Sequence, residues 1–295
     1  MLGTRFEGVM TALITPFRDG EVDEPALRGL VERQIEAGID GLVPCGSTGE
    51  SATLSHEEHN RVVEITIEAA AGRVPVVAGT GSNSTAEAIA LTAHAKEAGA
   101  SGALLLSPYY NKPTQEGIYE HYAAVARETA LPLVIYNIPG RTASNIAPET
   151  VGRLAQLEHV VGIKEASGDL DQMSHVVAAC PDDFAVLSGD DSLTLPLLSV
   201  GGTGVISTSS NVAPSQMTEL VRTFAAGDAG GARELHHALL PLFDALFCET
   251  NPIPVKAACA ALGWCDGEIR LPMTPITEPN LERLKLVLKD VGILK

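Results

Sequence analysis

The sequence predicts an α/β fold in which eight parallel strands, each followed by a helix, close into a (β/α)8 TIM barrel with a C-terminal helical appendage. Eight short apolar runs, typical of buried strands, alternate with segments of helical spacing between residues 9 and 226. Eight such units in this length favour a closed barrel over an open doubly wound sheet. An open sheet usually carries a glycine fingerprint after its first strand, and this sequence has none there.

The expected strands are short and bounded by turn-forming residues. They cover residues 9–17, 41–46, 75–81, 103–107, 131–137, 160–166, 185–189 and 204–208. Helix starts carry N-cap signals: Asp23 precedes the first helix, and Ser55 with Glu58 and Ser84 with Glu87 form capping boxes. Beyond residue 226 we expect only helices, at 232–247, 254–262 and 280–291. The predicted organisation is a barrel over residues 1–226, which would hold a catalytic site, and a helical region packed on it over 227–295.

Composition and charge exclude several classes of partner. Hydrophobic residues make up 45% of the 295 residues, enough for a large core. The net charge of −17 argues against nucleic acid and anionic membranes, because no basic surplus exists to neutralise phosphates. The five cysteines form no CxxC pair and are expected to be reduced thiols. With no signal-peptide or transmembrane-length apolar run, we expect a soluble cytoplasmic protein.

A lysine ends the expected sixth strand, in the segment VGIKEAS that starts at Val161. Burying an ammonium is costly, so a lysine held in such a place tends to have a lowered pKa and to serve as an amine nucleophile. Taken alone, the strand favours a simpler interpretation, in which Lys164 reaches water or pairs with Glu165 or Asp169.

Other polar residues follow the expected strands and should gather with Lys164 at the carboxyl rim of the barrel. Tyr136 lies on the neighbouring strand, and Ser47 and Thr48 stand in a glycine-flanked turn that could hold a small carboxylate. Arg141 could bind a second carboxylate. Taken singly, Ser47 and Thr48 could cap the next helix, Tyr136 could be a core residue and Arg141 could be solvated. Together they favour Schiff-base chemistry on a ketone.

Several catalytic patterns are not matched. The histidines of His56-Glu57-Glu58-His59 are three apart, so the HExxH zinc pattern is not met, and we expect no metal and no cofactor. Asp190-Asp191 is interpreted as a helix start.

The motifs in this order resemble the dihydrodipicolinate synthase family, within the pyruvate-dependent class I aldolase superfamily, over essentially the full chain. They are GSTGESATLS from Gly46, SPYYNKPTQEG from Ser107, YNIPGRT from Tyr136, GIKEASGD from Gly162, LSGDD from Leu187, GGTGVIS from Gly201, NPIPVK from Asn251 and LPMTPIT from Leu271. The resemblance implies condensation of pyruvate with L-aspartate 4-semialdehyde, in the biosynthesis of diaminopimelate and lysine.

The resemblance also implies site roles. Lys164 would form the imine with pyruvate, and Tyr136 would carry protons together with Ser47 and with Tyr110 from a neighbouring subunit. The remaining substrate-binding residues would be Thr48 for the pyruvate carboxylate, Ile206 through its backbone, and Arg141 for the carboxylate of the aldehyde. Two positions depart from the family pattern: Ser47, where threonine is frequent, and Gly140, where serine is common.

Regulation and assembly are implied in the same way. Members inhibited by L-lysine bind it at a subunit interface, and the matching residues here are Ser51, Ala52, His56, His59, Asn83, Glu87 and Tyr109. The two histidines and Glu87 could instead be exposed helix residues and a capping residue. The family expectation is a homotetramer built as a dimer of dimers.

Two further functions are compatible with parts of the pattern. The lysine, tyrosine and GSTGE set alone would fit an N-acetylneuraminate lyase or a keto-deoxy sugar acid aldolase. Arg141 favours the synthase, because it suits a short substrate with its own carboxylate. A non-catalytic 2-keto acid binding protein is disfavoured, since a pure binder has no need of a buried amine.

Overall fold

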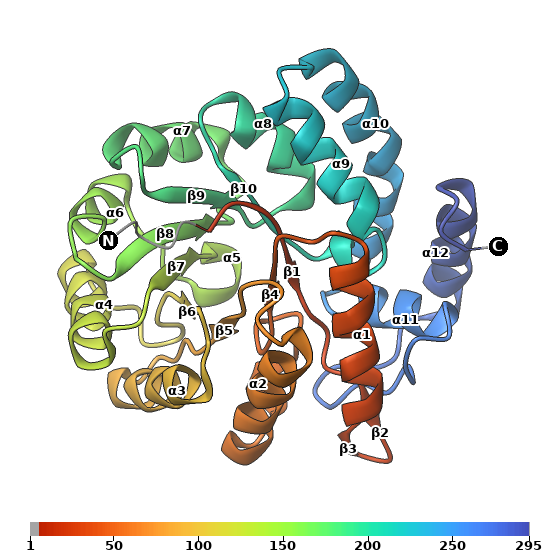
Figure 1. Ribbon diagram of the computed structural model, residues 1–295, viewed down its shortest axis with the longest axis horizontal. Helices are drawn as coiled ribbons and strands as arrows, with labels where there is room; N and C mark the ends of the chain where they lie inside the picture. The colour runs from red at the N-terminus through yellow and green to blue at the C-terminus, as the bar shows by residue number, and fades with distance from the viewer. Residues whose placement is uncertain (1–5, 295) are drawn as a thin grey trace.

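The computed structural model describes residues 6–294 and contains the predicted barrel (Figure 1). Its parallel strands pair in the order β4-β1-β10-β9-β8-β7-β6-β5, and a bridge between Leu42 and Val76 joins the two ends. At this seam the Gly79 N–H also donates to the Pro44 carbonyl, at 2.9 Å. The barrel strands are β1 (Gly8–Ala12), β4 (Gly41–Val43), β5 (Val77–Gly79), β6 (Gly102–Leu106), β7 (Leu133–Asn137), β8 (Val160–Glu165), β9 (Ala185–Ser188) and β10 (Gly204–Ser207).

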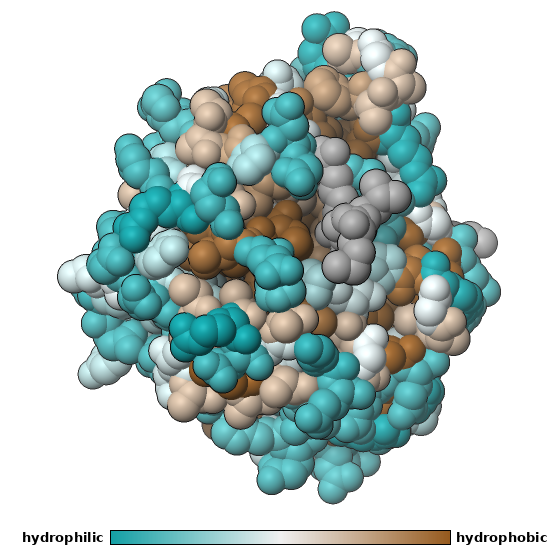
Figure 2. Space-filling model, turned by 60° about the vertical axis from the view of Figure 1, so that its left-hand side comes forward, coloured by the Kyte–Doolittle hydropathy of each residue, from teal (hydrophilic) through white to brown (hydrophobic). Residues whose placement is uncertain are grey.

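Helices surround the strands on the outside of the barrel (Figure 1). They are α1 (Glu24–Glu36), α2 (His56–Ala70), α3 (Thr85–Ala98), α4 (Gln115–Thr129), α5 (Pro139–Thr142), α6 (Pro148–Leu154), α7 (Leu170–Ala179), α8 (Thr194–Ser199) and α9 (Pro214–Ala225). Hydrophilic residues dominate the outer face seen in Figure 2, with apolar residues gathered between them. This pattern fits helices that bury one stripe against a sheet and leave the other side in water.

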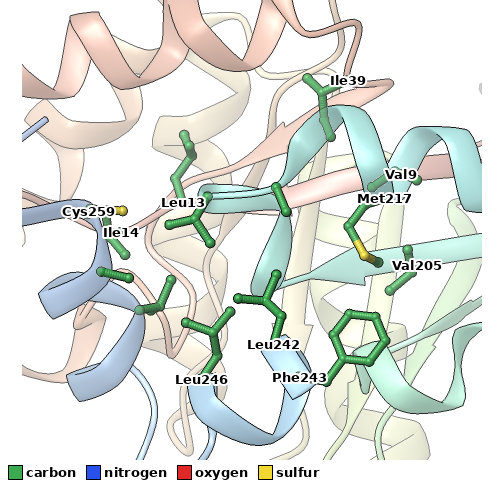
Figure 3. Close-up of a cluster of buried hydrophobic side chains, with 14 of the residues drawn as sticks. Val9, Leu13, Ile14, Ile39, Val205, Met217, Leu242, Phe243, Leu246 and Cys259 are labelled. Carbon is green, nitrogen blue, oxygen red and sulfur yellow. The ribbon is translucent and has the colours of Figure 1, made fainter. Parts of the chain in front are cut away.

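Three helices follow the barrel: α10 (Ala229–Leu246), α11 (Ile253–Ala261) and α12 (Glu278–Asp290). Leu242, Phe243 and Leu246 of α10 join one buried cluster with Val9 and Val205 of the barrel strands (Figure 3). The C-terminal helices therefore share a core with the barrel. The division of the chain at residue 226 stays a prediction.

The first strand was predicted too long. It ends at Ala12 rather than at residue 17, because the Ile14 N–H donates to Asn211 Oδ1 and Pro16 has no N–H to offer a neighbouring strand. The chain then forms a small antiparallel hairpin that the sequence reading missed, β2 (Phe17–Arg18) and β3 (Glu21–Val22). The short helix α5 was also missed.

The helix caps are confirmed with one exception. The Asp23 carboxylate accepts from the Ala26 N–H, and Ser55 and Glu58 form both bonds of a capping box. At the second predicted box, Ser84 accepts from the Glu87 N–H, but the Glu87 side chain binds Ser82 and His56 instead of the Ser84 backbone. A neighbouring serine and an imidazole outcompete the local bond, so Glu87 belongs to a tertiary contact.

Candidate active site

A cavity of about 410 Å³ lies at the carboxyl ends of the strands. Residues from both predicted sites line it. Ser47 and Tyr136 come from the catalytic set and Arg141 from the substrate-binding set. The regulatory set contributes Ser51, Ala52, His56, His59, Glu87 and Tyr109. The cavity thus joins part of the first predicted site to most of the second. The other predicted site residues are not in its lining: Lys164, Thr48, Ile206, Tyr110 and Asn83.

Lys164 and Tyr136 are neighbours across β7 and β8, where the strand register pairs them directly. Each side chain is buried, and the Lys164 Nζ lies 4.4 Å from the centre of the Tyr136 ring. Burial lowers the pKa of Lys164 to about 8, and Arg141 also lowers it, while the carboxylates of Asp190 and Asp191 act in the opposite direction. Near neutral pH a minor fraction of Lys164 is therefore a neutral, nucleophilic amine, far more than for an unshifted lysine.

Space for the Lys164 side chain depends on a glycine in the next strand connection. A Cβ on Gly189 would stand 3.1 Å from Lys164 Cε and closer still to the Ala166 Cβ. Because both contacts are tighter than ordinary van der Waals distance, a larger residue there would displace the amine. The LSGDD motif therefore has a steric role as well as supplying charge.

Tyr136 is suited to hold and transfer a proton. Burial raises the pKa of its phenol, with Asp190 adding to the increase, while Arg141 and a hydrogen bond with the Ser47 side chain lower it. The phenol is consequently protonated at neutral pH, and the Ser47 hydroxyl gives the proton a neighbouring acceptor.

The GSTGE turn is closed by its own backbone. The Gly46 carbonyl accepts from the Gly49 N–H at 3.1 Å, and the Ser47 carbonyl accepts from the Glu50 N–H at 3.2 Å. Thr48 is buried, and its Oγ1 accepts from Asn251 Nδ2 at 3.0 Å and lies 3.4 Å from Thr208 Oγ1. The turn thus presents hydroxyl groups held in defined directions.

Asn251 was not singled out individually, although it opens the NPIPVK motif. Besides its bond to Thr48, its carbonyl accepts from an Arg141 Nη at 2.8 Å. Asn251 therefore connects the predicted pyruvate-binding turn with the arginine predicted to bind the second substrate. The sequence signal was the motif itself, which gave no indication of the contact partners.

The predicted substrate-binding residue Ile206 and the predicted catalytic residue Tyr110 lie in two different settings. Ile206 is fully buried on β10, next to Met10 of β1. Tyr110, in contrast, is 89% exposed and has a left-handed backbone with φ +72°. The single chain does not bring the Tyr110 ring into a buried site.

The expected regulatory residues include two hydrogen-bonded pairs, His56 with Glu87 and Asn83 with Tyr109. His56 Nε2 lies 2.9 Å from Glu87 Oε1, and hydrogen bonds to Ser82 and to His56 hold the pKa of Glu87 below its usual range. His59 is buried with its Nε2 2.8 Å from the Gly79 carbonyl, and burial lowers its pKa. The last member, Asn83, donates to the Tyr109 carbonyl at 3.1 Å.

Asp190 stands at a helix start as predicted, in the N-cap position of a short 3-10 helix over Asp191–Leu193. Its side chain makes no capping bond, and within residues 6–294 its buried Oδ2 has no hydrogen-bond partner. Burial raises its pKa, and the charge of Lys164 opposes that effect. Asp191, by comparison, accepts from both the backbone and the hydroxyl of Ser209. Asp190 is thus an electrostatic neighbour of the lysine.

Two features that other functions would require are absent from the described residues. Among residues 6–294, His, Cys, Asp and Glu side chains form no group of three or more with the geometry to hold a metal ion. In the same residues, the helices lack the combination of length and apolarity that a membrane span needs.

Fold and site together define a TIM-barrel protein with a buried, partly neutral lysine beside a tyrosine. The sequence model of the dihydrodipicolinate synthetase family matches residues 5–291. The chain is 60% identical over 289 residues to the 4-hydroxy-tetrahydrodipicolinate synthase of Syntrophus aciditrophicus, covering 98% of this chain and 99% of that one. The chain belongs to the dihydrodipicolinate synthetase family.

Two solved structures add ligand information about relatives. The dihydrodipicolinate synthase of Acinetobacter baumannii, solved in complex with pyruvate, is 46% identical with a TM-score of 0.96, covering 98% of this chain and 99% of that one. The enzyme of Cyanidioschyzon merolae, solved with lysine bound, is 43% identical with a TM-score of 0.96 and the same two coverages.

The pKa of Lys164 predicts how its reactivity depends on pH. Reductive methylation with formaldehyde and a cyanoborohydride requires the neutral amine, so its rate at Lys164 should rise with pH through about 8 and then level off. The exposed Lys285, held by Glu282, serves as the control, because the ion pair raises its pKa and its rate should still be climbing well above pH 8. Peptide mass spectrometry measures both rates in one sample. A Lys164 profile that coincides with that of Lys285 would contradict the lowered pKa.

Proposed function

We propose that this protein is a 4-hydroxy-tetrahydrodipicolinate synthase, which condenses pyruvate with L-aspartate 4-semialdehyde in lysine and diaminopimelate biosynthesis. The observation that carries the proposal is the buried Lys164 amine, paired with Tyr136 across two strands, in a chain 60% identical to a synthase. Free thiols at all five cysteines agree with a reducing cytoplasmic location, which we include in the proposal.

In the first half of the reaction, the neutral Lys164 amine attacks the ketone carbon of pyruvate. A carbon–nitrogen bond forms, and the carbonyl oxygen leaves as water after proton transfers through Tyr136 and Ser47. The Thr48 hydroxyl and nearby N–H groups bind the pyruvate carboxylate, and the backbone of Ile206 lines the same place. Loss of a methyl proton then converts the imine into a nucleophilic enamine.

In the second half, the enamine carbon attacks the aldehyde carbon of the semialdehyde, and the aldehyde oxygen takes up a proton. The Arg141 guanidinium holds the carboxylate of this substrate. The amine of the new adduct then attacks the imine carbon, closes the ring and releases Lys164. No electron acceptor is required, because every bond change is balanced by proton transfer and by the water released earlier.

Tyr110 acts in this proposal from a second subunit. The Tyr110 side chain is 89% exposed, and its backbone is left-handed. An exposed aromatic ring of this kind could enter the active site of a neighbouring subunit. A homotetramer built as a dimer of dimers would complete the proton relay in each subunit.

The alternative is a lyase for a sialic acid or a keto-deoxy sugar acid, which would form the same lysine imine. Arg141 supports the synthase, because its guanidinium is tied to Asn251 near the turn that would hold pyruvate, where a short second carboxylate fits. The two activities are therefore separated by their second substrate.

The reaction class is tested by trapping. Incubation with pyruvate and borohydride should add one reduced pyruvate unit to Lys164, and Lys164→Arg should abolish the adduct, because a guanidinium stays protonated and is a poor nucleophile. Intact-mass and peptide mass spectrometry locate the adduct, and circular dichroism checks the fold of the variant. A wild-type chain without an adduct would overturn both the synthase and the lyase. Given an adduct, turnover of L-aspartate 4-semialdehyde but not of sialic acid is the expected result.

L-lysine is proposed as a feedback inhibitor bound by Ser51, Ala52, His56, His59, Asn83, Glu87 and Tyr109. The ionised Glu87 carboxylate offers a site for an ammonium group of the inhibitor. The lysine-bound relative supports this proposal.

Millimolar-scale lysine should slow the wild-type enzyme, and Glu87→Gln should raise the half-inhibitory concentration about tenfold or more, through loss of a charge-assisted bond. Each variant is compared with its own uninhibited rate in a steady-state assay. Glu97→Gln, an exposed position on the same helix α3, is the matched control and should leave the inhibition unchanged. An unchanged wild-type rate at millimolar lysine would refute the regulatory site.

A further inference from the structure

A buried ion pair joins the GSTGE turn to the C-terminal helical region. Glu50 ends the turn and Lys256 lies on α11, 206 residues later, yet their charged groups are in direct contact. The side chains are only 3% and 1% exposed. Burying two charges costs free energy unless further bonds satisfy them, and a lone remaining charge would cost more. Such a pair is therefore unlike the exposed ion pairs that cover the outer helices.

Additional contacts satisfy both charges. The second Glu50 oxygen, Oε2, accepts from the Arg270 N–H at 3.1 Å. Two cations lie over the Phe17 ring: Lys256 Nζ is 4.0 Å from its centre and Arg270 Cζ is 4.1 Å from it. The Arg270 side chain also pairs with Glu58 at the start of α2. The hairpin, the turn and the C-terminal region thus converge on Glu50.

The backbone at Glu50 explains why the turn needs such support. Its φ of +53° lies in the left-handed region, which a non-glycine residue adopts only when its surroundings enforce it. The preceding Gly49 carbonyl is held by the Thr15 hydroxyl at 2.7 Å. The direction in which Ser47 and Thr48 point therefore depends on contacts that fix the end of the turn.

The same C-terminal segment holds the turn at a second point. Asn251, five positions before Lys256 in the sequence, binds the Thr48 hydroxyl. Glu50 lines the active-site cavity, whereas Lys256 lines a separate cavity of about 340 Å³ between α11 and α12. Lys256 thus approaches the turn from the side opposite to the substrates.

We infer that Lys256 is a positioning residue for catalysis: through Glu50 it fixes the GSTGE turn so that Thr48 and Ser47 meet pyruvate in the productive orientation. The inference rests on the proposed function and adds to it a residue outside the substrate cavity. It predicts that loss of the pair weakens pyruvate binding more than it slows the later chemical steps. Lys164 keeps its charged neighbours Asp190, Asp191 and Arg141, so its titration should not move.

The experiment compares three variants with the wild-type protein. Lys256→Met removes the cation, and the double variant Glu50→Gln with Lys256→Met removes both charges while keeping an acceptor for the Arg270 N–H. Lys285→Met is the matched control, because it breaks an exposed lysine–glutamate pair on α12. Pyruvate half-saturation is measured by borohydride trapping alone, with no second substrate. Each variant is assayed at a temperature where circular dichroism shows it folded.

We expect Lys256→Met to raise the half-saturating pyruvate concentration about tenfold or more, since small displacements of binding groups are costly. The kcat, from a separate steady-state assay with both substrates saturating, should stay within about threefold of wild type. The pH midpoint of trapping should stay in place. The melting temperature of the double variant should return most of the way to the wild-type value, because no unpaired buried charge remains. Its half-saturating pyruvate concentration should stay as high as that of Lys256→Met. Lys285→Met should match the wild type in all measurements.

Two results would overturn the inference. One is a half-saturating pyruvate concentration within about twofold of the wild-type value in the folded Lys256→Met or double variant. The other is recovery of melting temperature and pyruvate binding together in the double variant, which would give the pair a purely structural role. A wild-type chain that traps no pyruvate contradicts the proposed function instead, so the two failures are distinguishable.

Discussion

The site depends on the burial of one amine. Lys164 is the penultimate residue of β8, with its Nζ over the Tyr136 ring, and desolvation brings its pKa to about 8. The barrel makes this arrangement possible, because adjacent parallel strands deliver their last side chains to one rim in a fixed register. The carboxylates of Asp190 and Asp191 partly offset the lowering of the pKa by desolvation. The amine therefore exchanges between its protonated and neutral forms near neutral pH, and the neutral form can react.

The rest of the site is organised by the GSTGE turn. The cavity runs along the turn, with Ser47 and Tyr136 in its wall together with His56 and Glu87. Catalytic and regulatory groups therefore line one cavity beside the turn, whose end is anchored by Glu50. The C-terminal helices contribute to this anchoring through Lys256 and are coupled to the chemistry, although the barrel rim supplies the reacting groups.

Much of this could be predicted from the sequence, because its signals were local. Strand–helix alternation gave the barrel, and the caps at Asp23 and Ser55 were confirmed at the bonds expected. Predictions failed where a distant group outcompeted a local one. Asn211 takes the N–H of Ile14 and ends the first strand early, and His56 takes part of the Glu87 carboxylate. The contacts of Asn251 and Lys256 with the turn span more than 200 residues, so no local pattern could reveal them.

The central claim, that Lys164 becomes covalently joined to pyruvate, is tested most directly by a crystal structure of the protein grown with pyruvate. The account predicts continuous electron density from Lys164 Nζ to the second carbon of pyruvate, with the carboxylate against the Thr48 hydroxyl. Pyruvate bound without a covalent link, or bound away from Thr48 with Lys164 as a free amine, would contradict it.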